Sequence, residues 1–262
     1  MRLQLHLSSY SSELMYNYNY SLSSAIYKLL RFSSPEFASF LHDIGFMQDG
    51  RTYKLFSFAL VFHNASFLKE HIELKDRNVK LIITSPLIES FVQNFIVGSF
   101  TSQKLLLTFK NSAVEFFILQ IESLPEPQIT SPVSFKLLSP LVLSTASTDS
   151  SLNKQYYLRP QDQSEINRVL SRNLLNKYKI INNKNLENAA VALEWDQDYL
   201  ARHSRVTKKI TINENGINPI DVIGIQAPFK LTGNAELIKT GYECGFGEKN
   251  SMGFGLAELI NS

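Results

Sequence analysis

A glycine-rich stretch near the C-terminus constrains the fold of this chain more than any other feature. Five of the 11 glycines fall within the 15 residues 241–255, GYECGFGEKNSMGFG. Glycine allows a backbone with positive φ and a close approach by other groups, and such a loop can point several N–H groups and Lys249 at an anion. The stretch does not match the dinucleotide-binding fingerprint, because Asn250 stands where the third glycine is needed, and it lacks the Gly-Lys-Ser/Thr of a P-loop. Glycine content alone predicts either an anion-binding loop or a tight structural hairpin.

The composition is that of a globular protein with one large domain or two small ones. The chain has 262 residues, of which 44% are hydrophobic and 19% are charged. No apolar run reaches the roughly 20 residues of a membrane span, and residues 1–7 alternate like a strand rather than forming a signal peptide. The single cysteine, Cys244, excludes an internal disulfide and a cysteine-based zinc site, and the five histidines lack ligand spacing. We expect a cytoplasmic prokaryotic protein with no metal, no cofactor and no membrane partner.

Charge is distributed unevenly along the chain. Residues 151–212 contain 11 Lys and Arg against 6 Asp and Glu, a balance of +5, so the rest of the chain carries −3 of the net +2. A basic second half is typical of a surface that binds a polyanion. A solvated surface that happens to be basic has the same composition.

The first half of the chain predicts strands and helices in the order β-α-β-β-α-β. Apolar side chains alternate or cluster as they do in strands at residues 2–7, 53–62, 79–84, 103–109 and 113–122. Helical spacing begins at Ser21 and again at Ser85, where the second helix is expected to reach about Gly98 with Ile88 and Phe91 facing inward. This order is that of the ferredoxin-like fold, whose helices cover one face of an antiparallel sheet.

A short additional helix is predicted between the first helix and the second strand. Ser34 suits its N-cap and Pro35 its first helical position. This helix runs to His42 and ends near Gly45. The strand that follows is predicted to be continuous from Tyr53 to Phe62, which places Lys54 at its start.

The second half repeats this plan after a linker at Leu124–Pro127. Asp162 and Glu165 have the spacing of a capping box at the start of a long helix, and Arg168 and Arg172 lie on its exposed stripe. A further helix is predicted at residues 235–239. Strands are predicted near residues 128–143, 189–195, 205–212, 219–231 and 254–259. We predict an α+β chain with two tandem ferredoxin-like domains, residues 1–123 and 128–262, of which the second carries the glycine-rich loop.

Several segments together resemble one family, the CRISPR repeat-processing endoribonucleases (the "Cas six" family of RAMP proteins). Residues 241–255 resemble the C-terminal glycine-rich signature of that family almost throughout. Its N-terminal and middle motifs are matched, in the family's order, by Ala25–Tyr27, Phe40–His42, Tyr53–Phe58, Ser131–Pro132, Tyr157–Leu158 and Asn173–Leu174. The resemblance spans nearly the whole chain.

The resemblance implies metal-independent cleavage of CRISPR repeat RNA by the RNA's own 2′-hydroxyl, which leaves a 2′,3′-cyclic phosphate and a 5′-hydroxyl. Tyr27, His42 and Lys54 occupy the positions of a Tyr-His-Lys catalytic set described in the family. These residue types suit that chemistry. Histidine titrates near neutrality, so His42 can transfer a proton for a gain of about 10²–10⁴. Lys54 can offset charge on the phosphorane, and Tyr27 can orient a hydroxyl or share in proton transfer.

The expected RNA contacts come from the glycine-rich loop and from basic side chains of the second half. They are Gly245, Gly247, Lys249, Asn250, Ser251, Gly253 and Gly255 in the loop, and Arg168, Arg172, Lys208 and Lys209 elsewhere. The expected partners are the repeat RNA in its precursor transcript (pre-crRNA) and a CRISPR effector complex, with the chain as a monomer or a homodimer.

Three alternatives stay open from the residues themselves. The chain can be a non-catalytic RNA-binding subunit of a CRISPR effector complex, or an enzyme that binds a small phosphate compound at the glycine loop. Each proposed catalytic side chain also has a structural interpretation. His42 can simply face water at a helix end, Tyr27 can lie at the edge of the core, and Lys54 can be a solvated lysine at a strand end.

Overall fold

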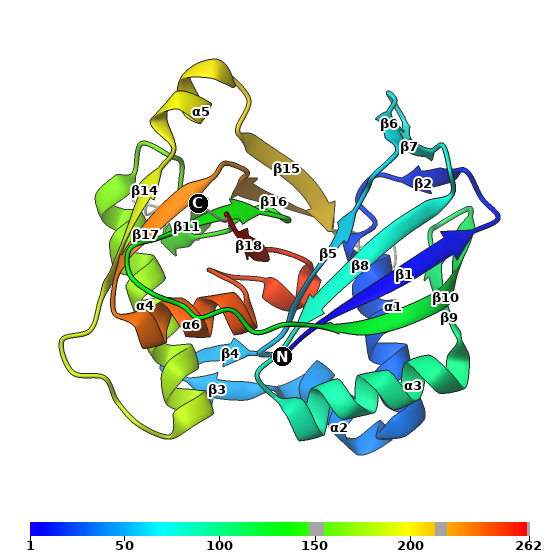
Figure 1. Ribbon diagram of the computed structural model, residues 1–262, viewed down its shortest axis with the longest axis horizontal. Helices are drawn as coiled ribbons and strands as arrows, with labels where there is room; N and C mark the ends of the chain where they lie inside the picture. Colours follow the sequence, from blue (N-terminus) through cyan, green and yellow to red (C-terminus); the bar gives the residue numbers. More distant parts are fainter. Residues whose placement is uncertain (147–154, 213–218, 261–262) are drawn as a thin grey trace.

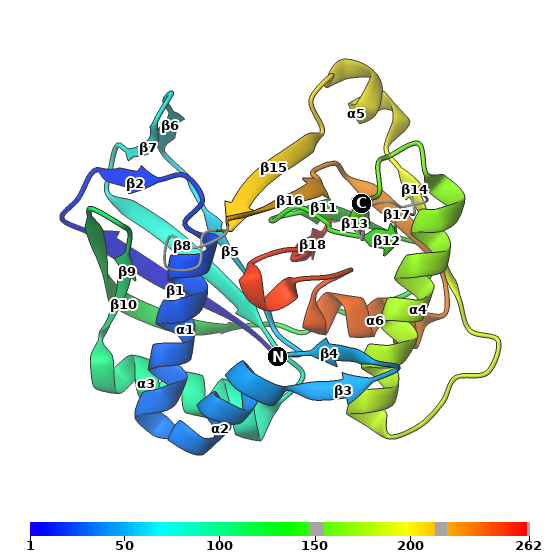
Figure 2. The same ribbon diagram turned by 180° about the vertical axis from the view of Figure 1, so that it is seen from behind.

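Two antiparallel sheets, each covered by helices, organise the chain (Figure 1). The computed structural model describes residues 1–146, 155–212 and 219–260. In Figure 1 the sheet of the first half lies to the right and that of the second half to the left, with the red glycine-rich segment between them; Figure 2 shows the same arrangement from behind. No helix in these described ranges is both long and apolar enough to cross a membrane.

The first sheet has the ferredoxin-like strand order that the sequence predicts. Its order is β5 (Ser57–Val61), β8 (Asn78–Thr84), β1 (Arg2–Ser9), β10 (Ala113–Leu124) and β9 (Lys104–Thr108), and all pairs are antiparallel. Helices α1 (Asn19–Ser33) and α3 (Asn94–Ser102) pack together on one face. The alternation of β1 puts Leu3, Leu5 and Leu7 into the core, where each is at most 2% exposed.

The second sheet repeats the same order with different strands. It runs β14 (Val191–Trp195), β17 (Phe229–Gly233), β11 (Val133–Leu137) and β18 (Ala257–Leu259), again antiparallel. Its helices are α4 (Gln163–Asn182) and α6 (Ala235–Cys244), which pack against each other. The prediction of two ferredoxin-like units is confirmed. The boundary between residues 123 and 128 stays a prediction; the two sheets use strands that end at Leu124 and begin at Val133.

Short elements complete the described residues. Three strands, β2 (Glu13–Met15), β7 (His71–Leu74) and β6 (Ala65–Phe67), form a small sheet. Three hairpins pair β3 (Phe46–Gln48) with β4 (Arg51–Tyr53), β12 (Ser144–Ala146) with β13 (Gln155–Tyr157), and β15 (Thr207–Ile212) with β16 (Ile220–Ile225). The remaining helices are α2 (Pro35–Ser39), α5 (Gln197–Arg202), π-helical turns at Phe40–Ile44 and Ile88–Gln93, and a 3₁₀ turn at Asn250–Met252.

Four details of the secondary structure differ from the prediction. The strand expected at 53–62 is broken after Tyr53, because Leu55 has a φ of 54° and turns the chain. The helix expected from Ser85 begins as a π-helical turn at Ile88, and the side chain of Ile88 is exposed rather than buried. The strand expected at 219–231 is two strands, β16 and β17. The helix expected to end at residue 239 continues to Cys244 and takes up the start of the glycine-rich stretch.

The capping box predicted at the start of α4 does not form. Asp162 is the N-cap residue but makes no side-chain bond to the helix; its Oδ2 accepts instead from the backbone N–H of Arg159 and the hydroxyl of Tyr156. Glu165 pairs with Arg168 through both of its side-chain oxygens. The cap predicted at Ser34 is present, since its hydroxyl accepts from the N–H of Phe37.

The glycine-rich segment fills the space between the two sheets. Its carbonyl groups accept hydrogen bonds from side chains of the first half: Ser57 Oγ bonds to Phe254 O at 2.9 Å, Asn19 Nδ2 to Met252 O at 2.9 Å, and Ser23 Oγ to Ser251 O at 2.7 Å. The rings of Phe246 and Phe254 are fully buried. The loop therefore joins the two halves.

Candidate active site

Three catalytic candidates from separate elements line one pocket. Tyr27 comes from α1, His42 from the π-helical turn that follows α2, and Lys54 from the turn after β4. They share a pocket of about 260 Å³ with Ser251 of the glycine-rich loop. The sequence places these residues 12 to 27 positions apart, and the fold brings them together.

Tyr27 and His42 are in direct contact. Their rings pack edge to face with centroids 5.1 Å apart, and Tyr27 also packs edge to face on the buried Phe56 at 5.7 Å. The side chain of His42 is 57% exposed, and its Nδ1 lies 2.7 Å from Asp43 Oδ1. The carboxylate fixes one ring nitrogen, which leaves Nε2 as the nitrogen available to a substrate.

Lys54 is tied to the same turn. Its ammonium donates a 2.8 Å hydrogen bond to the backbone carbonyl of His42. The turn ends at Gly45, which has a φ of 69°, and a Cβ at this position would lie 2.9 Å from Lys54 Cδ. Glycine at 45 thus both ends the helix and leaves room for the lysine.

The pocket perturbs the proton affinities of two of the three candidates. Burial raises the pKa of the Tyr27 phenol well above its ordinary value, while a hydrogen bond from Ser251 opposes this and Asp43 adds to it. Burial lowers the pKa of Lys54, and the nearby Asp43 carboxylate opposes that shift. Tyr27 therefore keeps its proton at neutral pH and can donate a hydrogen bond but not act as a base, whereas Lys54 keeps its charge less firmly than an exposed lysine does.

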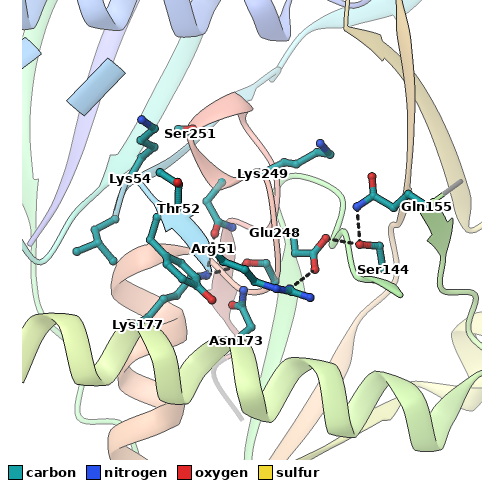
Figure 3. A pocket seen from close by; sticks show the side chains of 14 residues that line it. Arg51, Thr52, Lys54, Ser144, Gln155, Asn173, Lys177, Glu248, Lys249 and Ser251 are labelled. Atoms are coloured by element: carbon teal, nitrogen blue, oxygen red, sulfur yellow. Dashed lines mark hydrogen bonds and ion pairs between the residues drawn. The ribbon is translucent and has the colours of Figure 1, made fainter. Parts of the chain in front are cut away.

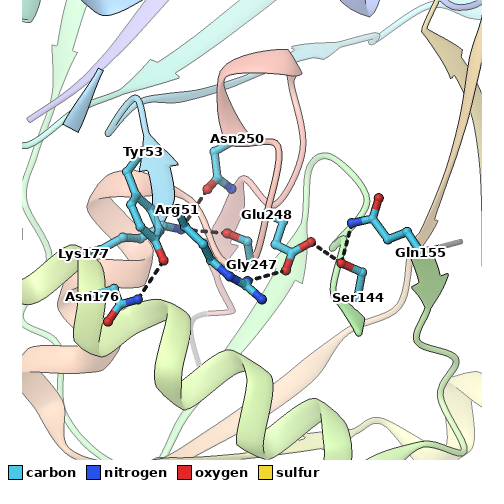
Figure 4. Close-up of polar contacts among 9 residues, drawn as sticks. All are labelled: Arg51, Tyr53, Ser144, Gln155, Asn176, Lys177, Gly247, Glu248 and Asn250. Carbon is cyan, nitrogen blue, oxygen red and sulfur yellow. Dashed lines mark hydrogen bonds and ion pairs between the residues drawn. The ribbon is translucent and has the colours of Figure 1, made fainter. Parts of the chain in front are cut away.

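A buried lysine holds the glycine-rich loop in place (Figure 4). Lys177 of α4 is 2% exposed, and its ammonium donates to Gly245 O at 2.7 Å, Gly247 O at 2.8 Å and Asn250 Oδ1 at 2.7 Å. Burial lowers the pKa of Lys177 to about 8, against the pull of Cys244 and Glu248. The loop thus turns carbonyl groups toward a cation inside the protein, which differs from the anion-facing N–H groups that the glycine pattern suggested.

Several N–H groups of the loop are also used internally. Those of Phe246, Glu248 and Gly255 donate to backbone carbonyls of Gly255, Val142 and Pro140, and those of Met252 and Gly253 close the 3₁₀ turn. The Asn250 side chain donates to Phe246 O and Phe254 O and accepts from Lys177, and it is 9% exposed. The side-chain amide of Asn250 is thus committed to the loop, while the residue borders the second pocket, and its contact with RNA stays a prediction.

A polar chain crosses from one half of the molecule to the other beside the loop (Figure 4). Arg51 Nη1 bonds to Glu248 Oε1 at 3.0 Å, Ser144 Oγ donates to Glu248 Oε2 at 2.5 Å, and Gln155 Nε2 donates to Ser144 Oγ at 2.6 Å. Arg51 belongs to β4, whereas the other three belong to the second half. These residues border a second pocket, of about 320 Å³, shown in Figure 3.

Comparisons with known proteins agree on one relationship. The sequence profile described as "CRISPR-associated protein Cas6, N-terminal" matches residues 13–122, and "CRISPR associated protein Cas6, C-terminal" matches residues 124–259. The chain belongs to the Cas6 family. The resemblance inferred from the motifs is thereby confirmed.

Relatives of known class extend this finding. CRISPR-associated endoribonuclease Cas6 1 of Methanocaldococcus jannaschii is 33% identical over 259 residues, which cover 98% of this chain and 91% of the relative. CRISPR-associated endoribonuclease Cas6 of Pyrococcus furiosus is 24% identical over 249 residues, 93% of this chain and 83% of the relative. The predicted enzyme class, an endoribonuclease, is confirmed.

Solved structures give the same fold. "CRISPR associated protein Cas6" has a TM-score of 0.76 at 30% identity and covers 100% of this chain and 99% of its own. "An RAMP protein binding different RNA substrates" has a TM-score of 0.79 at 22% identity with complete coverage of both chains, which supports the fold alone. The predicted tandem ferredoxin-like architecture is that of Cas6 structures.

The basic residues predicted in the second half of this Cas6-family chain have different surroundings. Arg168 pairs with Glu165 at 2.6 Å and Lys209 with Asp221 at 3.0 Å, whereas Arg172 is exposed on α4. Lys208 lies on the face of β15 that also carries Ile210 and Ile212, which pack with residues of the glycine-rich loop. None of these four borders the pocket that contains Tyr27, His42 and Lys54.

Two cations of that pocket were not predicted from the sequence. Lys28 and Arg31 of α1 line it, together with Tyr20, Ser24 and Tyr27. The positions 20, 24, 27, 28 and 31 share one helical face by their three- and four-residue spacing. This polar face lies opposite the apolar stripe of α1, so the signal was present in the sequence.

Among the described residues, no group of three or more His, Cys, Asp or Glu side chains is arranged to hold a metal ion. The metal-independent chemistry implied by the family resemblance stays a prediction.

Proposed function

We propose that this Cas6-family endoribonuclease cleaves CRISPR repeat RNA within its precursor, by attack of the RNA's own 2′-hydroxyl, to give a 2′,3′-cyclic phosphate and a 5′-hydroxyl. The observation that supports this is the convergence of Tyr27, His42 and Lys54 on one open pocket with further cations at its rim. In this proposal a proton-transferring group lies beside the reacting oxygens, and hydrogen-bonding and cationic groups lie beside the phosphate.

His42 transfers the proton in this proposal. Its ring is exposed to the pocket, and Asp43 holds Nδ1, so that Nε2 can meet the 2′-hydroxyl or the departing 5′-oxygen. The position of the RNA decides which of these two oxygens His42 serves, and a water molecule takes or gives the proton at the other oxygen.

Tyr27 and Lys54 stabilise the transition state rather than take up a proton. Because burial keeps the Tyr27 phenol protonated, its hydroxyl donates a hydrogen bond to a phosphate oxygen. The Lys54 ammonium, already oriented by the His42 carbonyl, offsets the charge that builds on the phosphorane.

The RNA strand enters along the glycine-rich loop in this proposal. Lys249 and Ser251 present side chains toward the pockets, and Gly245, Gly247, Gly253 and Gly255 set the course of the loop. Lys28 and Arg31 neutralise phosphates at the α1 side, and Arg168, Arg172, Lys208 and Lys209 extend the basic surface of the second half. The enzyme then acts in the cytoplasm as a monomer or homodimer and passes its product to a CRISPR effector complex.

The test is cleavage of the cognate repeat RNA by purified protein in EDTA. We expect a cyclic-phosphate product, a loss of about 10²–10⁴ in rate for His42→Ala, and unchanged cleavage for His63→Ala, an exposed histidine outside the pocket. A 2′-deoxy nucleotide at the cleavage position should abolish cleavage and leave binding intact. Tight binding without any product, together with indifference to His42→Ala, would show a non-catalytic RNA-binding subunit instead.

A further inference from the structure

The second pocket adjoins the candidate active pocket and shares two residues with it. Lys54 and Ser251 line both. In Figure 3 these two stand at one end of the second pocket, and Ser144 and Gln155 stand at the other. Its walls come from four places: β4 with the turn after it, the paired strands β12 and β13, helix α4, and the glycine-rich loop. A group attached to a phosphate at Lys54 can therefore reach into it.

An unpaired polar group lies in the wall of this pocket. Asn173 of α4 is 3% exposed, and its Oδ1 is buried without a hydrogen-bond partner among the described residues. Most buried polar side chains in proteins are paired. Its neighbours on the helix illustrate this: Asn176 donates to the hydroxyl of Tyr53, and Lys177 donates to the loop. Within the ranges that the structure describes, no donor reaches Asn173 Oδ1, which points to a ligand.

The charges around the pocket define the class of that ligand. Arg51, Lys54 and Lys249 border it as cations, and Glu248 as an anion whose two oxygens are already bonded to Arg51 and Ser144. A cationic rim with a buried amide in the wall suits a phosphate-linked group that carries hydrogen-bonding edges. At about 320 Å³ the pocket is at the small end of ligand sites, which fits one nucleotide rather than a folded stem.

We propose that this pocket takes the base of the nucleotide next to the scissile phosphate, turned out of the strand, with the Asn173 amide bonded to the edge of that base. Single-stranded RNA is commonly recognised through splayed bases that are read along their edges. The bound base pins the strand on one side of Lys54, so that the neighbouring phosphate lies between Lys54 and His42. The inference rests on the proposed function and adds a specificity-determining residue to it.

The experiment combines a protein variant with an RNA variant. Wild-type enzyme is assayed on repeat RNAs that carry one abasic site at each position around the cleavage site. We expect one adjoining position to lose about tenfold in kcat/KM. Asn173→Leu should lose a similar factor on intact RNA and nothing further on RNA that is abasic at that position. Asn182→Leu, an exposed residue of the same helix, is the matched control.

A stability measurement separates recognition from a structural role. Because Asn173 Oδ1 is unpaired, Asn173→Leu should keep or raise the Tm; a lowered Tm with a proportionate loss of activity on every RNA overturns the proposal. The proposal is also overturned if the losses in kcat/KM from Asn173→Leu and from the abasic site multiply, or if no abasic site lowers kcat/KM. Neither result would contradict the cleavage of repeat RNA. Failure of the wild-type enzyme to cleave any repeat RNA overturns the proposed function itself, and the role of the pocket with it.

Discussion

The ammonium of Lys177, a side chain that is 2% exposed, lies 2.7 Å from the amide oxygen of Asn250. Asn250 in turn bonds to the carbonyls of Phe246 and Phe254, so one buried cation and one amide fix both Gly-Phe-Gly units. The same loop carries Ser251, which contacts Tyr27 of the candidate active site. The geometry of the site therefore depends on a buried lysine whose ammonium is bonded to the loop.

We expect Lys177→Met to destabilise the protein by about 3 kcal/mol, because three buried acceptors lose a charged donor. Chemical unfolding at neutral pH measures this, with the exposed Lys179→Met of the same helix as control. An equal effect of the two substitutions would contradict the role assigned to Lys177.

The same pair of proteins tests the lowered pKa of Lys177. The folded protein releases this proton near pH 8, whereas the unfolded chain releases it near the ordinary value of 10.5. The unfolded state thus binds more protons in this window, so the contribution of Lys177 to stability rises with pH. The difference in unfolding free energy between wild type and Lys177→Met should grow by about 2 kcal/mol between about pH 7.5 and about pH 9.5. A constant or shrinking difference would place the pKa outside this range.

Gly255→Ala should be far more costly than a glycine substitution at similar backbone angles elsewhere. A Cβ at Gly255, where φ is 71°, would lie 1.9 Å from the carbonyl oxygen of Phe246. Gly50 has a φ of 70° but nothing within 4 Å of its missing Cβ. At both positions a left-handed backbone costs alanine about 1–2 kcal/mol. Gly50→Ala therefore measures the cost of the backbone conformation without a steric clash. We expect about 1 kcal/mol for Gly50→Ala and about 3 kcal/mol or more for Gly255→Ala, by thermal or chemical unfolding.

Arg2 connects the two halves and offers a test of their coupling. Its guanidinium donates to Ala257 O at 2.8 Å and Tyr242 O at 2.9 Å and stacks 3.8 Å above the Tyr242 ring. Because these contacts are buried and charge-assisted, Arg2→Leu should lower stability by about 2–4 kcal/mol. The exposed Arg205→Leu should change it little. Limited proteolysis between residues 125 and 132 should speed up in Arg2→Leu only; equal rates would show that the halves stay docked without it.

The fold could be predicted from the sequence where one physical rule dominates. Alternation and helical spacing gave the strand and helix order of the first half, and Gly45 correctly marks the end of the turn that carries His42. The break at Leu55 was missed because an apolar leucine between aromatic residues looks like continuous strand. In the fold Leu55 is buried beside Cys244 and its carbonyl accepts a hydrogen bond from Ser85, contacts that are distant in the sequence and that local sequence does not record.

The catalytic side chains of the site were predicted from the sequence, whereas the buried lysine that holds the neighbouring loop was not. The family motifs pointed to Tyr27, His42 and Lys54, and the structure brings these three together. Lys177 was overlooked because a helical lysine is ordinarily solvated. Its place three residues after the buried Leu174 puts it on the apolar face of α4. That spacing was the available signal, and the two carbonyls of the glycine-rich loop together with the Asn250 amide oxygen explain how a charge is tolerated there.

A substitution at Tyr27 tests whether its phenol donates a hydrogen bond or takes up a proton. Burial raises the pKa of its phenol, so the group stays protonated across the working range and cannot act as a base. Tyr27→Phe keeps the edge-to-face contact with His42 and removes only the hydroxyl, so kcat should fall about 10- to 100-fold without a change in the shape of the pH–rate profile. Tyr10→Phe, on a ring that is 82% exposed, should leave kcat unchanged. An alkaline limb that disappears in Tyr27→Phe would show that the phenol loses its proton within the assayed pH range, and Tyr27 rather than His42 would then be the acid that gives a proton to the departing 5′-oxygen.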